Sequence, residues 1–122
     1  MDEIFQGGCY GGDVRFEVAN IFDAGYCHCS ICRRFSGAPA IVWANALAES
    51  FRIMRGTPVG FASSENWERY FCPRCGCHLF GRYRQPPSET PALISLRSVQ
   101  SRHAPGHPPH CSYLVFLSDS LL

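Results

Sequence analysis

Three cysteines lie within six residues of this 122-residue chain, in the pattern Cys27-x-Cys29-x-x-Cys32. Two cysteines separated by one residue are poor partners for an unstrained disulfide, which needs particular Cα separations and dihedral angles. A tetrahedral zinc ion accepts several thiolates from one tight turn, and three protein ligands leave a fourth position for water or substrate. The spacing therefore predicts a catalytic type of zinc site at Cys27, Cys29 and Cys32.

A second cluster, Cys72-Pro73-Arg74-Cys75-Gly76-Cys77, has the form of a zinc knuckle. The proline fixes the φ angle of the turn, and the glycine allows a left-handed backbone that lets amides point at the sulfurs. A knuckle supplies two ligands, so a closed structural site needs two more. The candidates elsewhere in the chain are Cys9, Cys77, His78 and Cys111.

Two other interpretations compete with a pair of zinc sites. The Cys-x-x-Cys of the second cluster could be a redox motif, but such motifs sit beside a βαβ pattern, which this sequence lacks. The two clusters could also share one structural four-cysteine zinc ribbon. That ribbon would use only four of the eight cysteines, and the surplus favours two sites.

Composition indicates a single globular domain over residues 1–122, with 46% hydrophobic and 17% charged residues. Residues 1–8 lack the apolar run of a signal peptide, and residues 39–48 form too short an apolar stretch to cross a bilayer. We therefore expect a cytoplasmic protein without a membrane partner. In that compartment clustered cysteines bind metal more often than they form disulfides.

The charge of the chain argues against a nucleic-acid binder. Eleven basic and ten acidic side chains give a net charge of +1, which provides no general attraction for DNA or RNA. A chromatin-binding role would require a basic stripe on one face of the fold. The arginines available for such a stripe are Arg33, Arg34, Arg52, Arg55, Arg69, Arg74, Arg82 and Arg84.

The elements that must position the cysteines have the pattern of short β-strands. Residues 13–18 alternate apolar and polar side chains, with Val14, Phe16 and Val18 on one face. Further segments rich in β-branched and aromatic residues are predicted as strands: 40–44, 51–55, 69–72, 78–83, 92–96 and 113–117. Only residues 30–35 and 45–49 look helical. The sequence predicts a mainly β protein with short helical turns.

Three ordered motifs resemble the glutathione-dependent formaldehyde-activating enzyme family, which includes the centromere protein V type of domain. The motifs are Gly7-Gly8-Cys9-Tyr10-Gly11-Gly12-Asp13-Val14-Arg15-Phe16, then Cys27-His28-Cys29-Ser30-Ile31-Cys32-Arg33-Arg34, then Arg69-Tyr70-Phe71-Cys72-Pro73-Arg74-Cys75-Gly76. The resemblance runs from residue 7 to about residue 117. It implies a β-tent fold stapled by cysteine-ligated zinc.

The resemblance also implies how the cysteines divide between two zinc ions. The first cluster matches the catalytic type of site in full. Three ligands of a structural site are matched as well, by Cys9, Cys72 and Cys75. Gly11 stands where the family pattern has the fourth cysteine, and glycine has no side chain to donate. We therefore predict weakened coordination at this site or a ligand recruited from elsewhere, because metal binding is part of the folding free energy of such sites.

The reaction that the resemblance implies is the addition of glutathione, or a related thiol, to formaldehyde or a similar small aldehyde by a carbon–sulfur lyase. Three thiolates leave a zinc complex with one net negative charge, which suits holding an attacking thiolate better than activating water. Arg33 and Arg34 follow the third ligand and could bind a glutathione carboxylate or pair with acidic surface neighbours. A non-catalytic glutathione carrier or a zinc-stabilised interaction module would use the same residues.

Overall fold

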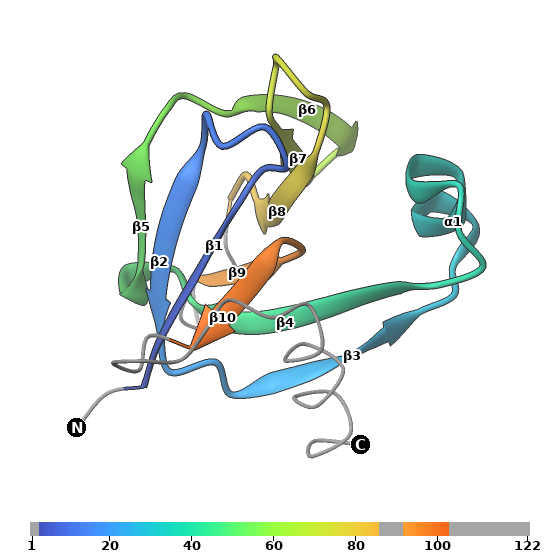
Figure 1. Ribbon diagram of the computed structural model, residues 1–122. Coiled ribbons are helices and arrows are strands. Elements are labelled where there is room, and N and C mark those ends of the chain that lie inside the picture. The colour runs from blue at the N-terminus through green and yellow to red at the C-terminus, as the bar shows by residue number, and fades with distance from the viewer. Residues whose placement is uncertain (1–2, 86–91, 103–122) are drawn as a thin grey trace.

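The structure is a computed structural model that describes residues 3–85 and 92–102. Ten strands and one short α-helix make up this part of the chain (Figure 1). All strand pairs are antiparallel, and they form one four-stranded and one six-stranded sheet. The predicted mainly β class is confirmed.

The four-stranded sheet has the strand order β10-β1-β2-β5. Its members are β1 (Ile4–Gly8), β2 (Arg15–Ala19), β5 (Phe51–Arg55) and β10 (Val99–Arg102). The predicted alternation in residues 13–18 is present, because Val14, Phe16 and Val18 are all buried. The face of the sheet that carries these three side chains therefore packs toward the core.

The six-stranded sheet has the order β3-β4-β9-β8-β7-β6. Its members are β3 (Asp23–Cys27), β4 (Ile41–Leu47), β6 (Val59–Ser64), β7 (Trp67–Phe71), β8 (His78–Tyr83) and β9 (Leu93–Leu96). The helix α1 (Ser30–Ser36) connects β3 to β4 beyond their ends (Figure 1). Its Phe35 ring packs on the six-stranded sheet, with its centroid 6.1 Å from that of Phe61 in β6 and 5.8 Å from that of His78 in β8. In the described part of the chain, no helix is long and apolar enough to span a membrane.

The core lies where the two sheets meet. Buried residues from both sheets form one cluster, to which Phe16 and Phe80 belong. The ring centroid of Phe51 lies 5.3 Å from that of Phe16 and 4.8 Å from that of Phe80, so three aromatic rings join the sheets. Cys9 and Cys72 are part of the same buried cluster. Two of the predicted ligands of the structural site therefore lie in the hydrophobic core.

The strands predicted at residues 51–55 and 78–83 have the observed bounds, and those at 13–18, 40–44, 69–72 and 92–96 differ by up to three residues at an end. The helical prediction for residues 30–35 is confirmed by α1. The prediction for residues 45–49 is wrong in part, because residues 45–47 continue β4 and only Ala48–Ser50 form a 3₁₀ turn. Pairing of β4 with β9 overrides the weak local preference there. The strand predicted at residues 113–117 lies outside the described residues.

Candidate metal centres

The seven described cysteines form no disulfide, and six of them gather into two separate groups of three. We call Cys27, Cys29 and Cys32 the helix triad, and Cys9, Cys72 and Cys75 the core triad. Within each triad the sulfur atoms lie within 4.8 Å of one another. Sulfurs bound to tetrahedral zinc at about 2.3 Å lie about 3.8 Å apart, so each triad fits the ion after a small closure. The interpretation of one shared four-cysteine ribbon is wrong.

The helix triad is built by the turn that joins β3 to α1. Cys29 is the N-cap residue of α1, and its sulfur accepts a hydrogen bond from the Cys32 backbone N–H at 3.3 Å. The helix ends at Gly37, whose φ of 69° is a left-handed conformation that glycine adopts at little cost. Local sequence alone therefore brings these sulfurs together.

The three thiols of the helix triad differ in environment. Cys29 is exposed, Cys27 is half-buried and Cys32 is buried. Hydrogen bonds from the Cys32 backbone, and from the side chains of Cys32 and Cys27, lower the pKa of the Cys29 thiol to about 7. Burial and the neighbouring thiols raise the pKa of Cys32, although Arg69 opposes this rise. The exposed Cys29 sulfur thus ionises more readily than the buried Cys32 sulfur, and solvent reaches the triad from the side of Cys29.

Arg69 of β7 contacts the buried sulfur of the helix triad. Its Nη1 and Nη2 atoms lie 3.8 and 3.7 Å from Cys32 Sγ. Its Nε–H donates to Ser63 Oγ at 3.1 Å, and its guanidinium carbon lies 4.7 Å from the centroid of the Phe35 ring. These contacts hold a positive charge beside Cys32 and dock α1 against the six-stranded sheet.

Arg97, which follows β9, also approaches the helix triad. Burial lowers the pKa of its guanidinium, and the thiols of Cys32 and Cys27 counteract that effect. Its Nη1 donates a hydrogen bond to Ser95 Oγ at 2.7 Å. In residues 3–85 and 92–102, neither Arg69 nor Arg97 forms an ion pair with a carboxylate. The sequence carried no local signal for this role, because both arginines are distant from Cys32 along the chain.

The predicted carboxylate-binding residues Arg33 and Arg34 are exposed in the last turn of α1. Arg34 lines a pocket of about 390 Å³ together with Phe35 and Phe61. A second pocket, of about 450 Å³, is lined by Phe35 and Arg97 among others. Small-molecule pockets have volumes of about 300–1,000 Å³, so both are large enough to hold part of a thiol substrate. The role of the two helix arginines stays a prediction.

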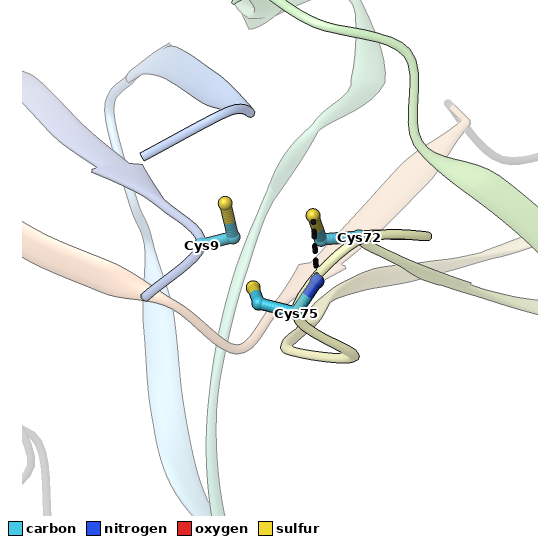
Figure 2. A group of neighbouring side chains, drawn as sticks. All are labelled: Cys9, Cys72 and Cys75. Atoms are coloured by element: carbon cyan, nitrogen blue, oxygen red, sulfur yellow. Dashed lines mark hydrogen bonds between the residues drawn. The ribbon is translucent and has the colours of Figure 1, made fainter. Parts of the chain in front are cut away.

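The core triad joins parts of the chain that are far apart in sequence. Cys9 follows β1, whereas Cys72 and Cys75 lie in the turn between β7 and β8, and Figure 2 shows Cys9 facing that pair. Cys9 and Cys72 are buried and Cys75 is exposed. The Val14 N–H donates to Cys9 Sγ at 3.3 Å, and the Cys75 N–H donates to Cys72 Sγ at 3.5 Å. Hydrogen bonds from the backbone lower the pKa of the Cys75 thiol to about 7, and the largest contribution comes from Gly11, followed by Cys77.

The other candidate ligands of the core triad lie elsewhere. The sulfur of Cys77 lies 3.3 Å from Ser98 Oγ and is not part of the triad. The His78 ring packs on the Phe35 ring of α1, with centroids 5.8 Å apart. Cys111 lies outside the described residues. Gly11 does adjoin the triad, because a Cβ atom built on it would lie 3.7 Å from Cys75 Sγ.

Several arginines considered for a basic stripe have other partners. Arg52, Arg74 and Arg84 each form an ion pair with a carboxylate, at 3.4, 3.5 and 3.2 Å. Arg82 stacks on the Tyr70 ring and donates to its hydroxyl at 2.7 Å. These pairings agree with the predicted lack of nucleic-acid binding, which stays a prediction.

The fold and the two triads define a mainly β protein with two cysteine clusters placed to bind metal. The model of the glutathione-dependent formaldehyde-activating enzyme family matches residues 4–112. This chain therefore belongs to that family, as the three motifs predicted. A crystal structure of a Rhodobacter sphaeroides protein is similar, with a TM-score of 0.60 and 25% sequence identity over 75% of this chain and 83% of that chain.

Proposed function

We propose that this chain is a zinc-dependent carbon–sulfur lyase that adds glutathione, or a related thiol, to formaldehyde or a similar small aldehyde at the helix triad. Family membership supports the reaction class. The observation that carries the proposal is the charge around the triad. Arg69 contacts Cys32 Sγ and Arg97 interacts electrostatically with Cys32 and Cys27, and the described residues supply no carboxylate that pairs with either arginine.

The charge balance favours an anionic sulfur as the substrate. Three thiolates and one divalent cation carry one net negative charge. Arg69 and Arg97 add two positive charges, so the assembly is left with one positive charge. An uncompensated charge in a partly buried site is costly. An incoming thiolate brings the total to zero, whereas water or a neutral aldehyde does not.

When bound, zinc would keep the substrate thiol ionised at neutral pH. A sulfur lone pair of the thiolate then forms the C–S bond with the aldehyde carbon, the C=O π electrons move to oxygen, and that oxygen takes a proton from solvent. The reverse reaction breaks the same C–S bond. The positive charges of Arg69 and Arg97 stabilise the thiolate form, and the exposed side at Cys29 admits it. Arg34, at the edge of the adjacent pocket, is placed to bind a carboxylate of the thiol.

The variant Cys29→Ser tests this proposal, because serine is a preferred N-cap residue and should preserve the start of α1. We expect the variant to fold like the parent and to bind one metal equivalent fewer. Its rate of adduct formation above the uncatalysed reaction should fall by about 100-fold or more, since even changes beyond the direct ligands cost about 10–100-fold. The rate is measured by NMR with glutathione and formaldehyde.

Cys77→Ser is the matched control, because its sulfur contacts Ser98 and lies outside both triads. It should keep the parent's metal content and rate. Full adduct formation by Cys29→Ser would contradict the enzyme proposal. A parent protein that binds glutathione without accelerating the addition would instead be a thiol carrier.

A further inference from the structure

We propose that the core triad holds its metal through three protein sulfurs and takes a small thiolate from solution as the fourth ligand, at the position beside Gly11. This inference concerns a different site from the lyase proposal and stands or falls separately. Tetrahedral zinc in an all-protein structural site has four ligands, and the described residues here bring only three to one place.

The core triad is accessible to solvent at one of its three residues, Cys75. Cys9 and Cys72 are buried in the hydrophobic core, and each cysteine offers one sulfur to a metal. Cys75 is exposed, and its sulfur lies on the solvent side of the group. Figure 2 shows Cys9 opposite Cys72 and Cys75.

Gly11 lies where a fourth ligand would come from. A Cβ atom on it would lie 3.4 Å from Cys75 Cβ and 3.7 Å from Cys75 Sγ, which are ordinary contact distances. The glycines with positive φ are Gly12, Gly37, Gly56 and Gly76, so Gly11 is not required by its backbone conformation. The missing side chain therefore leaves space for a ligand next to the sulfurs.

Two other side chains that could bind metal, Cys77 and Asp13, make different contacts. The Cys77 sulfur lies 3.3 Å from Ser98 Oγ and 3.5 Å from the His78 carbonyl oxygen. The carboxylate of Asp13 pairs with Arg74 Nε at 3.5 Å. Within the described ranges, no fourth cysteine, histidine or acidic side chain joins the triad. Among residues 3–85 and 92–102, the position beside Gly11 is thus not filled by a protein ligand, and we infer that a ligand from solution takes it.

The chemistry of the triad selects a thiolate for that position. Zinc with soft sulfur ligands favours further thiolate. Backbone N–H groups of Val14, Cys75 and Gly11 donate to the three sulfurs, which reduces their negative charge and allows a fourth anion. The incoming thiol loses its proton to solvent as the metal–sulfur bond forms. Because a Cβ atom at Gly11 would already be in van der Waals contact with Cys75, a small thiolate suits this position best.

The test measures zinc affinity by chelator competition in the full chain carrying Cys29→Ser, so that one complete triad remains. The probe is 2-mercaptoethanol, with a correction for zinc that it binds itself. We expect the probe to lower the apparent Kd for zinc by about tenfold or more, the scale on which changes around a metal site act. Adding Gly11→Cys should give the same gain without the probe and should remove the response to it.

Two variants control for steric and general thiol effects. Gly11→Ala adds a Cβ without a donor, and it should neither raise zinc affinity nor strengthen the response to the probe. Tyr10→Cys adds a thiol to the same turn, but this position is 94% exposed, so it should behave like the parent. Cobalt loading provides a second readout, because a fourth sulfur should intensify the thiolate charge-transfer absorption when the probe is added.

Either of two results would overturn the inference. The parent could bind zinc as tightly as the Gly11→Cys protein and ignore 2-mercaptoethanol, which would show that the chain supplies its own fourth ligand. Alternatively, the parent could fail to bind zinc at the core triad even with the probe present. If Gly11→Cys does not fold, the response of the parent to the probe decides the question alone.

Discussion

The two triads have the same number of sulfurs but are supported in opposite ways. The core triad joins the end of β1 to the turn between β7 and β8, and two of its cysteines belong to the hydrophobic core. The helix triad comes from one short turn at the end of the β3–β4 arm (Figure 1), where α1 packs on the six-stranded sheet through Phe35. A metal bound to the core triad would cross-link the fold, whereas one bound to the helix triad would be reached from the exposed Cys29.

The triads also differ in what surrounds their sulfurs. Backbone N–H groups donate to sulfurs of both triads, but only the helix triad also interacts with guanidinium groups, those of Arg69 and Arg97, among the described residues. An amide N–H stabilises a thiolate by a hydrogen bond without adding net charge. An arginine adds a full positive charge, which is costly in a partly buried site unless an anion balances it. Ligand number alone therefore does not distinguish the two triads. Our proposal of a reactive helix triad rests instead on its exposure and on the charge of its neighbours.

The strongest challenge to this comparison is to remove one ligand from each triad and measure stability. Cys72→Ser places a hydroxyl in the core and disrupts a metal site, so its Tm should fall by about 10 °C or more. Cys29→Ser should lower Tm by less than about 4 °C, because serine preserves the N-cap. Cys75→Ser removes a ligand of the same triad at an exposed position, so its Tm reports the loss of metal binding without a hydroxyl buried in the core. Equal Tm losses for Cys72→Ser and Cys29→Ser would refute the division into cross-link and reactive site.

A second, smaller effect concerns charge at the helix triad. Arg69→Met keeps an apolar stem against Phe35 but removes the charge beside Cys32. The Kd for glutathione, measured by calorimetry on the zinc-loaded protein, should rise by about tenfold, as expected for one lost hydrogen bond to a charged group. Arg82→Met is the matched control, since Arg82 stacks on an aromatic ring away from the triads. An unchanged Kd in Arg69→Met would remove the charge argument.

The smallest effect is a difference in thiol reactivity in the metal-free protein. The pKa values of Cys29 and Cys75 are both lowered to about 7, so about half of each thiol is ionised at pH 7, against about 1% for a thiol at 9.0. Their alkylation by iodoacetamide should slow about fivefold between pH 7 and pH 6, as the thiolate protonates, and should level off above pH 8. Burial raises the pKa of Cys32, which should react more slowly than Cys29. Peptide mapping by mass spectrometry measures each rate, and a common rate for all cysteines would contradict the prediction.

The strands were predictable where side chains carry the pattern. Residues 13–18 alternate, and residues 78–83 are apolar and aromatic, so β2 and β8 could be placed from sequence. The strands β1, β3, β6 and β10 were missed. Gly7 and Gly8 in β1 and Gly25 in β3 have low strand propensity, and these segments are strands because neighbours pair with them. Strand propensity is a property of the single residue, whereas strand formation also depends on the neighbouring strand with which the segment pairs.

By itself, the sequence determined the helix triad, because all three cysteines fall within one turn whose geometry is local. It also determined the family, through motifs that remain in order along the chain. Only the tertiary structure placed Arg69 and Arg97 beside Cys32 and turned Cys77 away from the core triad. These contacts join strands that are far apart in sequence, and spacing along a chain does not encode which distant side chains antiparallel pairing brings together.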